Sequence, residues 1–279
     1  MEIQRIAAFS VNGSGGNPAG VMLLDNWIDD SEMARIAADV GYSETAFAVA
    51  QDSQQLSWRV RYFSPESEVP FCGHATIALG VVLGKTIGSG SYTLDLNHAT
   101  ITVDAEQDNG EIIATLVSPP TRSQPLTETE LVDMLHLFSL QQADLHPTIP
   151  PARIHGGADH IVLPLHSRQI LADMHYQLDE GRRLMRQHEL VTVMLVYVEN
   201  NQTFVARNAF ASGGVLEDPA TGAAAAAFAG YLRDIEWPHQ HRITIRQGDD
   251  MGQPSLIKVT ITQGKGQPVK VSGRARVIG

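Results

Sequence analysis

Two short stretches hold most of the residues that could carry chemistry, and they look like two copies of one pattern. Cys72 and Gly73 precede one Ala-rich apolar segment, and Thr221 and Gly222 precede another. Each segment is apolar enough to form a buried helix. The first N–H groups of a helix lack partners inside it and carry the positive end of its dipole. Two such helix starts facing each other predict an anion-binding cleft.

His74 lies in the first turn of the earlier helix, directly after Gly73. Cysteine is a poor capping residue, so the N–H groups of Gly73 and His74 could remain for a ligand. The alternative is a core histidine bonded to a backbone carbonyl. Cys72 could be a thiol activated by the helix start, or it could only fill space. Because Thr221 stands where a second cysteine would be needed, a two-thiol acid/base pair is excluded.

The second copy carries a carboxylate close to its helix. Asp218 directly precedes Pro219, which is an ordinary way to begin a helix. Alternatively, Thr221 caps a helix that begins at Gly222, and Asp218 is free to point into the cleft. We expect the neighbouring Glu217 to be a solvated charge or a charge at a strand edge.

Glu44 stands at the start of an apolar strand. A carboxylate entering an apolar lobe is poorly solvated, which suits a general acid/base, although an exposed charge leading a strand is the simpler alternative. No metal site is expected, because the histidine pairs 155/160 and 239/241 lack a third ligand at a characteristic spacing. Neither a nucleophile elbow nor a dinucleotide fingerprint occurs. Proton transfer without a cofactor is therefore the simplest chemistry.

The composition limits the class of protein. The 279 residues are 43% hydrophobic and 18% charged, with a net charge of −11 and one cysteine. No basic stripe is available for nucleic acid, and one cysteine excludes an internal disulfide. The sequence has no signal-peptide pattern and no run of the about eighteen apolar residues that a membrane span needs. We expect a cytoplasmic protein with no membrane or nucleic-acid partner.

The elements that must position these residues repeat along the chain. Strands are expected at 2–11, 19–24, 45–50, 56–63, 91–96, 99–105, 112–117, 160–165, 191–198, 203–210, 241–246, 255–262 and 269–277. Helices are expected at 31–40, capped by Asp30 and Ser31 and ended by Gly41, and at 127–137. The glycine-rich loop 12–18 is interpreted as a plain connection between strands rather than a phosphate loop.

The proline-rich segment 118–125 is interpreted as a hinge rather than an element. The order of elements partly repeats beyond it, which indicates an internal duplication. We therefore predict an α+β fold of two similar lobes, each a sheet wrapped around a central helix. The first lobe would cover 1–118 and the second 119–267, with 268–279 returning to the first.

Several motifs, spread from near residue 7 to near residue 277, resemble the phenazine-biosynthesis PhzF-like isomerases. They are Gly16-Asn17-Pro18-Ala19-Gly20-Val21, Ser43-Glu44-Thr45-Ala46-Phe47, the segment from Phe63-Ser64-Pro65 to Cys72-Gly73-His74, Glu217-Asp218-Pro219-Ala220-Thr221-Gly222, Gln247-Gly248 with Met251-Gly252-Gln253-Pro254-Ser255, and Val271-Ser272-Gly273-Arg274-Ala275. The resemblance implies a diaminopimelate-epimerase-like fold, a site between the lobes, a homodimer and no cofactor.

The resemblance also assigns roles to residues. Glu44 is similar to the acid/base that moves a proton between carbons of the substrate, with His74 and Asp218 as its polar partners. The substrate carboxylate would be held at residues that match the motifs, namely Asn17, Cys72, Gly73, Thr221, Gly222 and Ala223. Ala223 departs from the phenazine enzyme, which has serine there, and Gln253 replaces a usual arginine. A Phe-x-Pro pattern is also missing before Glu217, so these departures concern substrate identity.

The sequence therefore favours a cofactor-independent isomerase that acts on a small carboxylate-bearing metabolite through Glu44. An amino-acid-type epimerase or racemase using Cys72 is one alternative. A non-catalytic protein that binds small carboxylates is the other.

Overall fold

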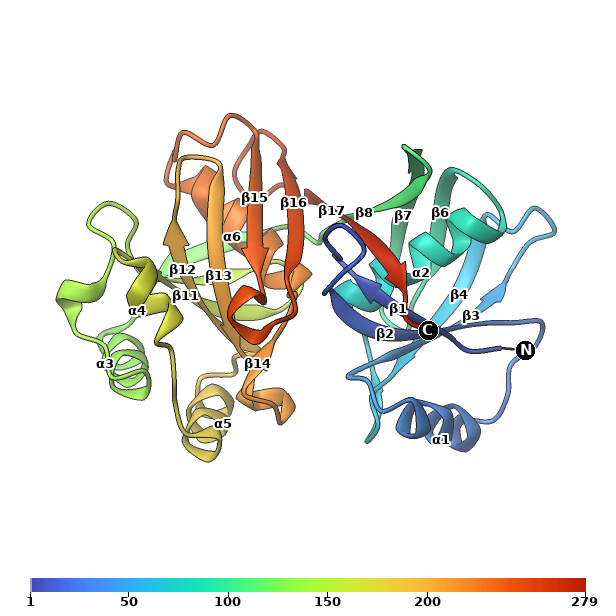
Figure 1. The fold of residues 1–279 in the computed structure, drawn as a ribbon, viewed down its shortest axis with the longest axis horizontal. Helices are drawn as coiled ribbons and strands as arrows, with labels where there is room; N and C mark the ends of the chain where they lie inside the picture. Colours follow the sequence, from blue (N-terminus) through green and yellow to red (C-terminus); the bar gives the residue numbers. More distant parts are fainter. Residues whose placement is uncertain (1) are drawn as a thin grey trace. The chain divides into compact units, whose positions relative to one another are not determined.

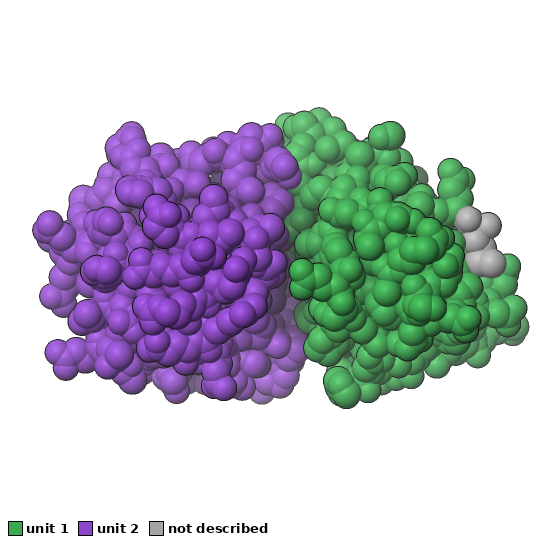
Figure 2. All heavy atoms as spheres, turned by 90° about the horizontal axis from the view of Figure 1, so that it is seen from below, with its two compact units in different colours: residues 1–117, 272–279 green, residues 118–271 purple. Residues whose placement is uncertain are grey.

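The computed structural model describes residues 2–279, and this part of the chain divides into two compact units (Figures 1 and 2). The first unit comprises residues up to Val117 and Ser272–Gly279, and the second comprises Ser118–Val271. None of the helices in residues 2–279 is both long and apolar enough to cross a membrane.

The first unit holds eight complete strands and two helices. It also holds most of a further strand, which begins in the second unit and ends in the first. Its elements are β1 (Gln4–Ala8), β2 (Asn17–Leu24), α1 (Asp30–Val40), β3 (Thr45–Ala50), β4 (Ser57–Phe63), β5 (Glu68–Val69), α2 (Gly73–Thr86), β6 (Gly90–Asp95), β7 (Thr100–Asp108), β8 (Glu111–Val117) and the end of β17 (Val269–Val277). The expected return of the last strand is seen in the antiparallel pairing of β17 with β1.

The sheet of the first unit carries a helix on each face. β1 and β2 form an antiparallel pair across the glycine-rich loop, as expected for a plain connection, and β2 lies parallel to β3. The apolar helix α2 packs against one face, on β8, β2 and β7 (Figure 1). Gly80 permits this close approach, because a Cβ there would lie 2.6 Å from Cγ2 of Val103. A smaller cluster around Met33 and Phe47 packs α1 on the opposite face.

Helix α1 ends at Gly41 as expected, in a left-handed conformation with φ 71°. Its expected cap was wrong, because Asp29 is the N-cap residue and provides no side-chain cap. The Asp30 carboxylate instead accepts a hydrogen bond of 2.6 Å from Arg61 on β4. This ion pair joins the start of α1 to the sheet.

The second unit repeats the plan with more helices. Its elements are β9 (Arg122–Pro125), α3 (Glu128–Leu137), β10 (Ala152–His155), β11 (Asp159–Leu165), α4 (Arg168–Ala172), α5 (Leu178–Gln187), β12 (Thr192–Val198), β13 (Thr203–Ala209), β14 (Glu217–Asp218), α6 (Gly222–Asp234), β15 (Arg242–Gln247), β16 (Ser255–Ile261) and the start of β17, together with three short 3-10 turns. The segment 118–125 is not only a hinge, because its second half is β9, which pairs antiparallel with β10.

Side chains alternate between the two faces of the second sheet. Phe204 on β13 meets Phe228 of α6 edge-on, with ring centroids 5.0 Å apart, so α6 covers this face (Figure 1). Val205, next along β13, belongs to a cluster with Met134 of α3 and Leu184 of α5. The second sheet therefore lies between α6 and the helices α3, α4 and α5.

Candidate active site

Glu44 lies at the end of the turn between α1 and β3. Its backbone oxygen accepts a hydrogen bond of 3.1 Å from the N–H of Gly20, which continues the parallel pairing of β2 with β3. The Glu44 side chain is only 15% exposed. The interpretation of Glu44 as an exposed charge leading a strand was therefore wrong, because most of its side chain is shielded from solvent.

His74 brings three reactive side chains together at the start of α2. Its Nε2 atom lies 3.4 Å from Oε2 of Glu44 and 3.3 Å from Oγ of Ser43. Its Nδ1 atom lies 3.3 Å from Sγ of Cys72. The ring is buried, and these partners are side chains rather than a backbone carbonyl. A carboxylate and a thiol thus flank one imidazole, an arrangement that can hold and move a proton.

The start of α2 has the form that the sequence predicted. Cys72 is the N-cap residue and makes no side-chain cap. The first hydrogen bond of the helix runs 3.0 Å from the N–H of Thr76 to the Cys72 oxygen, so the N–H groups of Gly73 and His74 precede it. Burial raises the pKa of Tyr62, which keeps its hydroxyl protonated. That hydroxyl lies 2.7 Å from Oγ1 of Thr76, which in turn donates to the Cys72 oxygen.

Among residues 2–279, the same cluster is the one group of three side chains whose atoms are close enough together to ligate a metal ion. Glu44, Cys72 and His74 each offer one ligand atom, and these atoms lie within 4.8 Å of one another. Sequence spacing could not reveal it, because Glu44 is far from the other two along the chain. His155 and His160, by contrast, turn to separate partners, Asp159 and Thr192.

The second unit holds Asp218 beside the start of α6. The helix begins at Gly222 with Thr221 as the N-cap residue, but the Thr221 hydroxyl does not cap it. That hydroxyl donates a hydrogen bond of 2.5 Å to Oδ2 of Asp218, which is 8% exposed. The interpretation of Asp218 as the start of the helix was wrong, because Asp218 belongs to strand β14.

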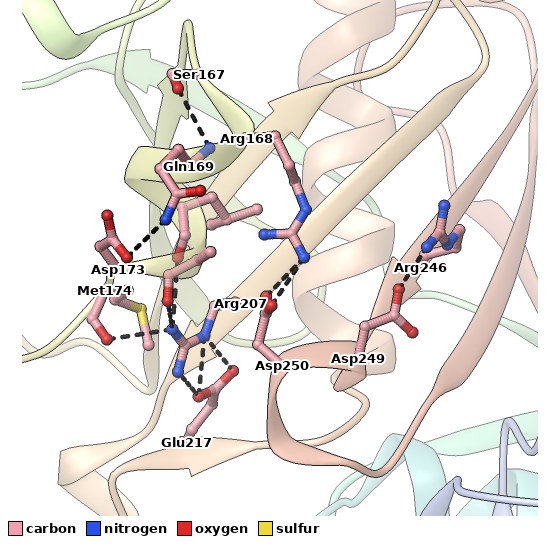
Figure 3. Close-up of polar contacts among 12 residues, drawn as sticks. Ser167, Arg168, Gln169, Asp173, Met174, Arg207, Glu217, Arg246, Asp249 and Asp250 are labelled. Atoms are coloured by element: carbon pink, nitrogen blue, oxygen red, sulfur yellow. Dashed lines mark hydrogen bonds and ion pairs between the residues drawn. The ribbon is translucent and has the colours of Figure 1, made fainter.

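Glu217 fixes this strand from its other face (Figure 3). Its carboxylate, 6% exposed, accepts hydrogen bonds of 3.0 and 2.6 Å from Nε and Nη2 of Arg207. Nη1 of Arg207 also donates 2.8 Å to the carbonyl of Ala172, at the end of α4. Nearby, Arg168 pairs with Asp250 after β15. The expectation of a solvated Glu217 was therefore wrong, because a buried ion pair anchors β14 and so positions Asp218.

The remaining predicted site residues lie at the starts of elements. Asn17 is the first residue of β2, is buried, and stands opposite Ala8 of β1. Gly222 and Ala223 precede the first hydrogen bond of α6, which runs 3.0 Å from the N–H of Ala225 to the Thr221 oxygen.

Sequence reasoning missed one residue that contacts Thr221 at the start of α6. Gln247 of β15 accepts a hydrogen bond of 3.3 Å from the Thr221 N–H, and its amide nitrogen lies 3.1 Å from the Thr221 hydroxyl. Gln247 lies in one of the motifs that resemble the family, but the resemblance assigned no role to this residue.

Comparison with known proteins identifies the family. The model of the phenazine biosynthesis-like proteins, PhzC-PhzF, matches residues 6–278. The chain therefore belongs to this family, which confirms the resemblance.

Relatives and one solved structure cover nearly the whole chain. An uncharacterized isomerase, YddE of Escherichia coli O157:H7, is 28% identical over 99% of this chain and 96% of its own. The trans-2,3-dihydro-3-hydroxyanthranilate isomerase of Pseudomonas chlororaphis is 28% identical over 90% of this chain and 87% of its own. The fold matches a PhzF-family protein of Bacillus anthracis with a TM-score of 0.87 at 20% identity, covering 100% and 98% of the two chains. The expectation of a mixed α/β isomerase of the PhzF type is thus confirmed at the level of family and fold.

Proposed function

We propose that this protein is a cofactor-independent isomerase that moves a proton between two carbons of a small carboxylate-bearing metabolite. The observation that carries the proposal is the contact of Glu44 with His74, 3.4 Å apart at the start of α2. A poorly solvated carboxylate next to an imidazole is the kind of group that removes a proton from carbon. The relative from Pseudomonas chlororaphis is named for a substrate that is itself a carboxylate.

In the proposed reaction, Glu44 removes a proton from one carbon, and the electron pair of the broken C–H bond moves into the adjacent conjugated system. The protonated Glu44 then returns the proton to another carbon of the same system. His74 orients the carboxylate through its Nε2 atom. The N–H groups of Gly73 and His74, before the first hydrogen bond of α2, suit the substrate carboxylate.

We further propose that the second unit acts on the same substrate through Asp218, Gly222 and Ala223. Its support is the matching chemistry of the two helix starts, each without a side-chain cap. If Asp218 takes part, Asp218→Asn should lower turnover even when Glu44 is intact. A homodimer is expected from the family and is checked by light scattering.

The experiment begins with a screen of small carboxylic acids for thermal stabilisation, with trans-2,3-dihydro-3-hydroxyanthranilate among them. Binding only to the folded state stabilises by about 2.7 kcal/mol at a hundredfold excess over the dissociation constant. Proton NMR in deuterated water then follows each hit. We expect Glu44→Gln to abolish exchange while the variant still folds and binds, whereas Glu66→Gln, an exposed control, should exchange normally. Full activity in Glu44→Gln would refute the proposal.

An epimerase that uses Cys72 remains the second candidate, because its Sγ atom lies 3.3 Å from Nδ1 of His74. In that case deuterium should enter at a stereocentre, and Cys72→Ala should stop its entry. A normal rate in Cys72→Ala would leave Glu44 as the proton carrier. Tight binding of a carboxylate with no exchange at any carbon would instead indicate a binding protein.

A further inference from the structure

Five polar side chains of the second unit form one continuous hydrogen-bonded chain that ends on Asp218. Four of them are at most 1% exposed. In order, the members are His160, Thr192, Asn208, Gln247 and Thr221.

Strand register explains how residues so far apart in sequence meet. His160 of β11 stands beside Thr192 of β12, and Ala206 of β13 stands beside Gln247 of β15. Asn208 of β13 pairs with Asp218 of β14. Because side chains two apart on a strand share a face, Asn208 lies on the face of Ala206 and of Phe204, which packs against α6. The chain therefore crosses the sheet underneath the start of α6.

In each hydrogen bond that links two members of this chain, the donor is the member farther from Asp218 along the chain and the acceptor is the nearer one. Gln247 donates from its Nε2 atom 2.7 Å to the backbone oxygen of Asp218, so its Oε1 atom is the acceptor that faces Asn208. The nitrogen of the Asn208 side chain donates to it at 3.0 Å, which leaves Oδ1 of Asn208 to accept from the hydroxyl of Thr192 at 3.1 Å.

The two ends of the chain follow from its middle. The Thr192 hydroxyl donates its only hydrogen to Asn208. Nδ1 of His160, 2.8 Å away, must therefore be the donor to the Thr192 oxygen. At the other end, Gln247 donates to the Thr221 hydroxyl, which donates in turn to Asp218. Hydrogen bonds aligned in one direction polarise one another, and here the positive ends all face a carboxylate.

His160 shows that this chain does not conduct protons. The ring is completely buried, and its Nε2 atom has no hydrogen-bond partner among residues 2–279. Burial, and secondarily His155, lowers the pKa of His160 to about 3, so the ring is neutral at neutral pH. In the described part of the protein no proton donor contacts the far side of the His160 ring, so the effect of the chain is to orient and polarise.

We propose that this buried chain is a positioning device that commits the Thr221 hydroxyl to Asp218 and so keeps the Asp218 carboxyl group oriented as a hydrogen-bond acceptor. The substrate groups it would orient are donors, such as an amino or hydroxyl group. Gln247 is the central positioning residue, because it contacts Asn208, Thr221 and Asp218. The inference rests on the proposed function in making Asp218 part of the site.

A first experiment tests the direction of the chain without any substrate. Two-dimensional 15N NMR of the labelled full-length protein at pH 7 reports which ring nitrogen of each histidine carries hydrogen, and His160→Gln assigns the signal. We expect His160 to carry hydrogen on Nδ1 and none on Nε2. Hydrogen on Nε2 alone would reverse the first link and overturn the proposal.

A second experiment tests the effect on Asp218. Gln247→Glu replaces the donating nitrogen with an oxygen facing Thr221, while Gln263→Glu makes the same change at an exposed position of the same unit. With the compound that exchanges in the wild type, Gln247→Glu should slow deuterium entry about a hundredfold, the cost typical of a small misplacement of reacting groups. The acidic limb in the pH profile of the deuterium-exchange rate of Gln247→Glu should also move to higher pH. The reason is that the Thr221 hydrogen is then drawn away from Asp218.

The matched control should keep both the rate and the profile of the wild type. If Gln247→Glu does not fold, Thr192→Val removes one donor, and Thr192→Ser restores it; only Thr192→Val should alter the profile. A wild-type profile in Gln247→Glu or in Thr192→Val would overturn the proposal. If no compound exchanges in the wild type, the proposed function fails, and the His160 measurement still decides the direction of the chain.

Discussion

Acid should destabilise the second unit through His160, and the size of the effect follows from its burial. In the unfolded chain this histidine has an ordinary pKa near 6.5. Complete burial, with the nearby His155 as a smaller cause, lowers the pKa of His160 to about 3 in the folded protein. At pH values between these two pKa values, His160 is protonated in the unfolded chain but not in the folded protein. The free energy of unfolding therefore rises with pH in this range.

The magnitude can be worked from the same numbers. Stability from this group is fully present above the unfolded pKa of about 6.5 and is lost as pH falls toward 3. Each pH unit in that window is worth about 1.4 kcal/mol for one group. Between pH 7.5 and pH 5.0, only the part below about 6.5 counts, which gives a loss of about 2 kcal/mol.

The assay is urea unfolding at both pH values, followed by circular dichroism and by tryptophan fluorescence, to which Trp237 of the same unit contributes. Because burial also lowers the pKa values of His146 and His239, the wild type alone does not isolate one histidine. The comparison is therefore with His160→Gln, whose stability should fall by about 2 kcal/mol less over the same interval. His98→Gln, an exposed control, should behave as the wild type. Equal losses in His160→Gln and the wild type would refute this reasoning.

Two further changes test how the second unit is held together, both measured by urea unfolding at pH 7.5. Glu217→Gln should cost about 3 kcal/mol, because it leaves the Arg207 guanidinium buried without its carboxylate; a loss no larger than that of exposed Glu189→Gln would contradict this. Gly156→Ala should cost about 2 kcal/mol, because the new Cβ would lie 2.7 Å from the backbone nitrogen of Ala227 in α6; unchanged stability would show that the turn can move away.

The elements with a strong local signal were predictable from the sequence. The run of small and apolar residues from Gly222 onward marks α6, and the alternation of Trp58, Val60 and Tyr62 marks β4, whose three side chains are buried. In both cases neighbouring residues carry the whole pattern. The strand expected at 56–63 is observed as β4, and α6 begins at Gly222, one of the two starts that the sequence left open.

Helix α5 was missed because Gly181 lies inside it. A glycine in a helix interior costs about 1 kcal/mol relative to alanine, which argues against a helix when the sequence is taken alone. The structure gives a reason for this residue, since a Cβ at Gly181 would lie 2.4 Å from the Tyr176 ring. The spacing of Gly181, Leu184 and Met185, all buried on one side, is the signal that could have found the helix.

The candidate site was predictable only in part, for a different reason. The glycine at each helix start and the nearby carboxylates could be recognised locally. The contact of Glu44 with His74 joins residues thirty positions apart, and the ion pair of Glu217 with Arg207 depends on strand pairing. Single polar residues in strands, such as Asn208 and Gln247, carry no local mark of the network that they form.

The starts of α2 and α6 differ in a way that bears on the proposed mechanism. In the first unit, Glu44, His74 and Cys72 are three groups that can gain or lose a proton within contact distance. In the second unit, the matching position is Thr221, whose hydroxyl already donates to Asp218. A two-base reaction needs a second proton carrier, and a hydroxyl that already donates its hydrogen to Asp218 is a poor one. The asymmetry therefore supports the proposed reaction, in which a single carrier in the first unit both removes and returns the proton.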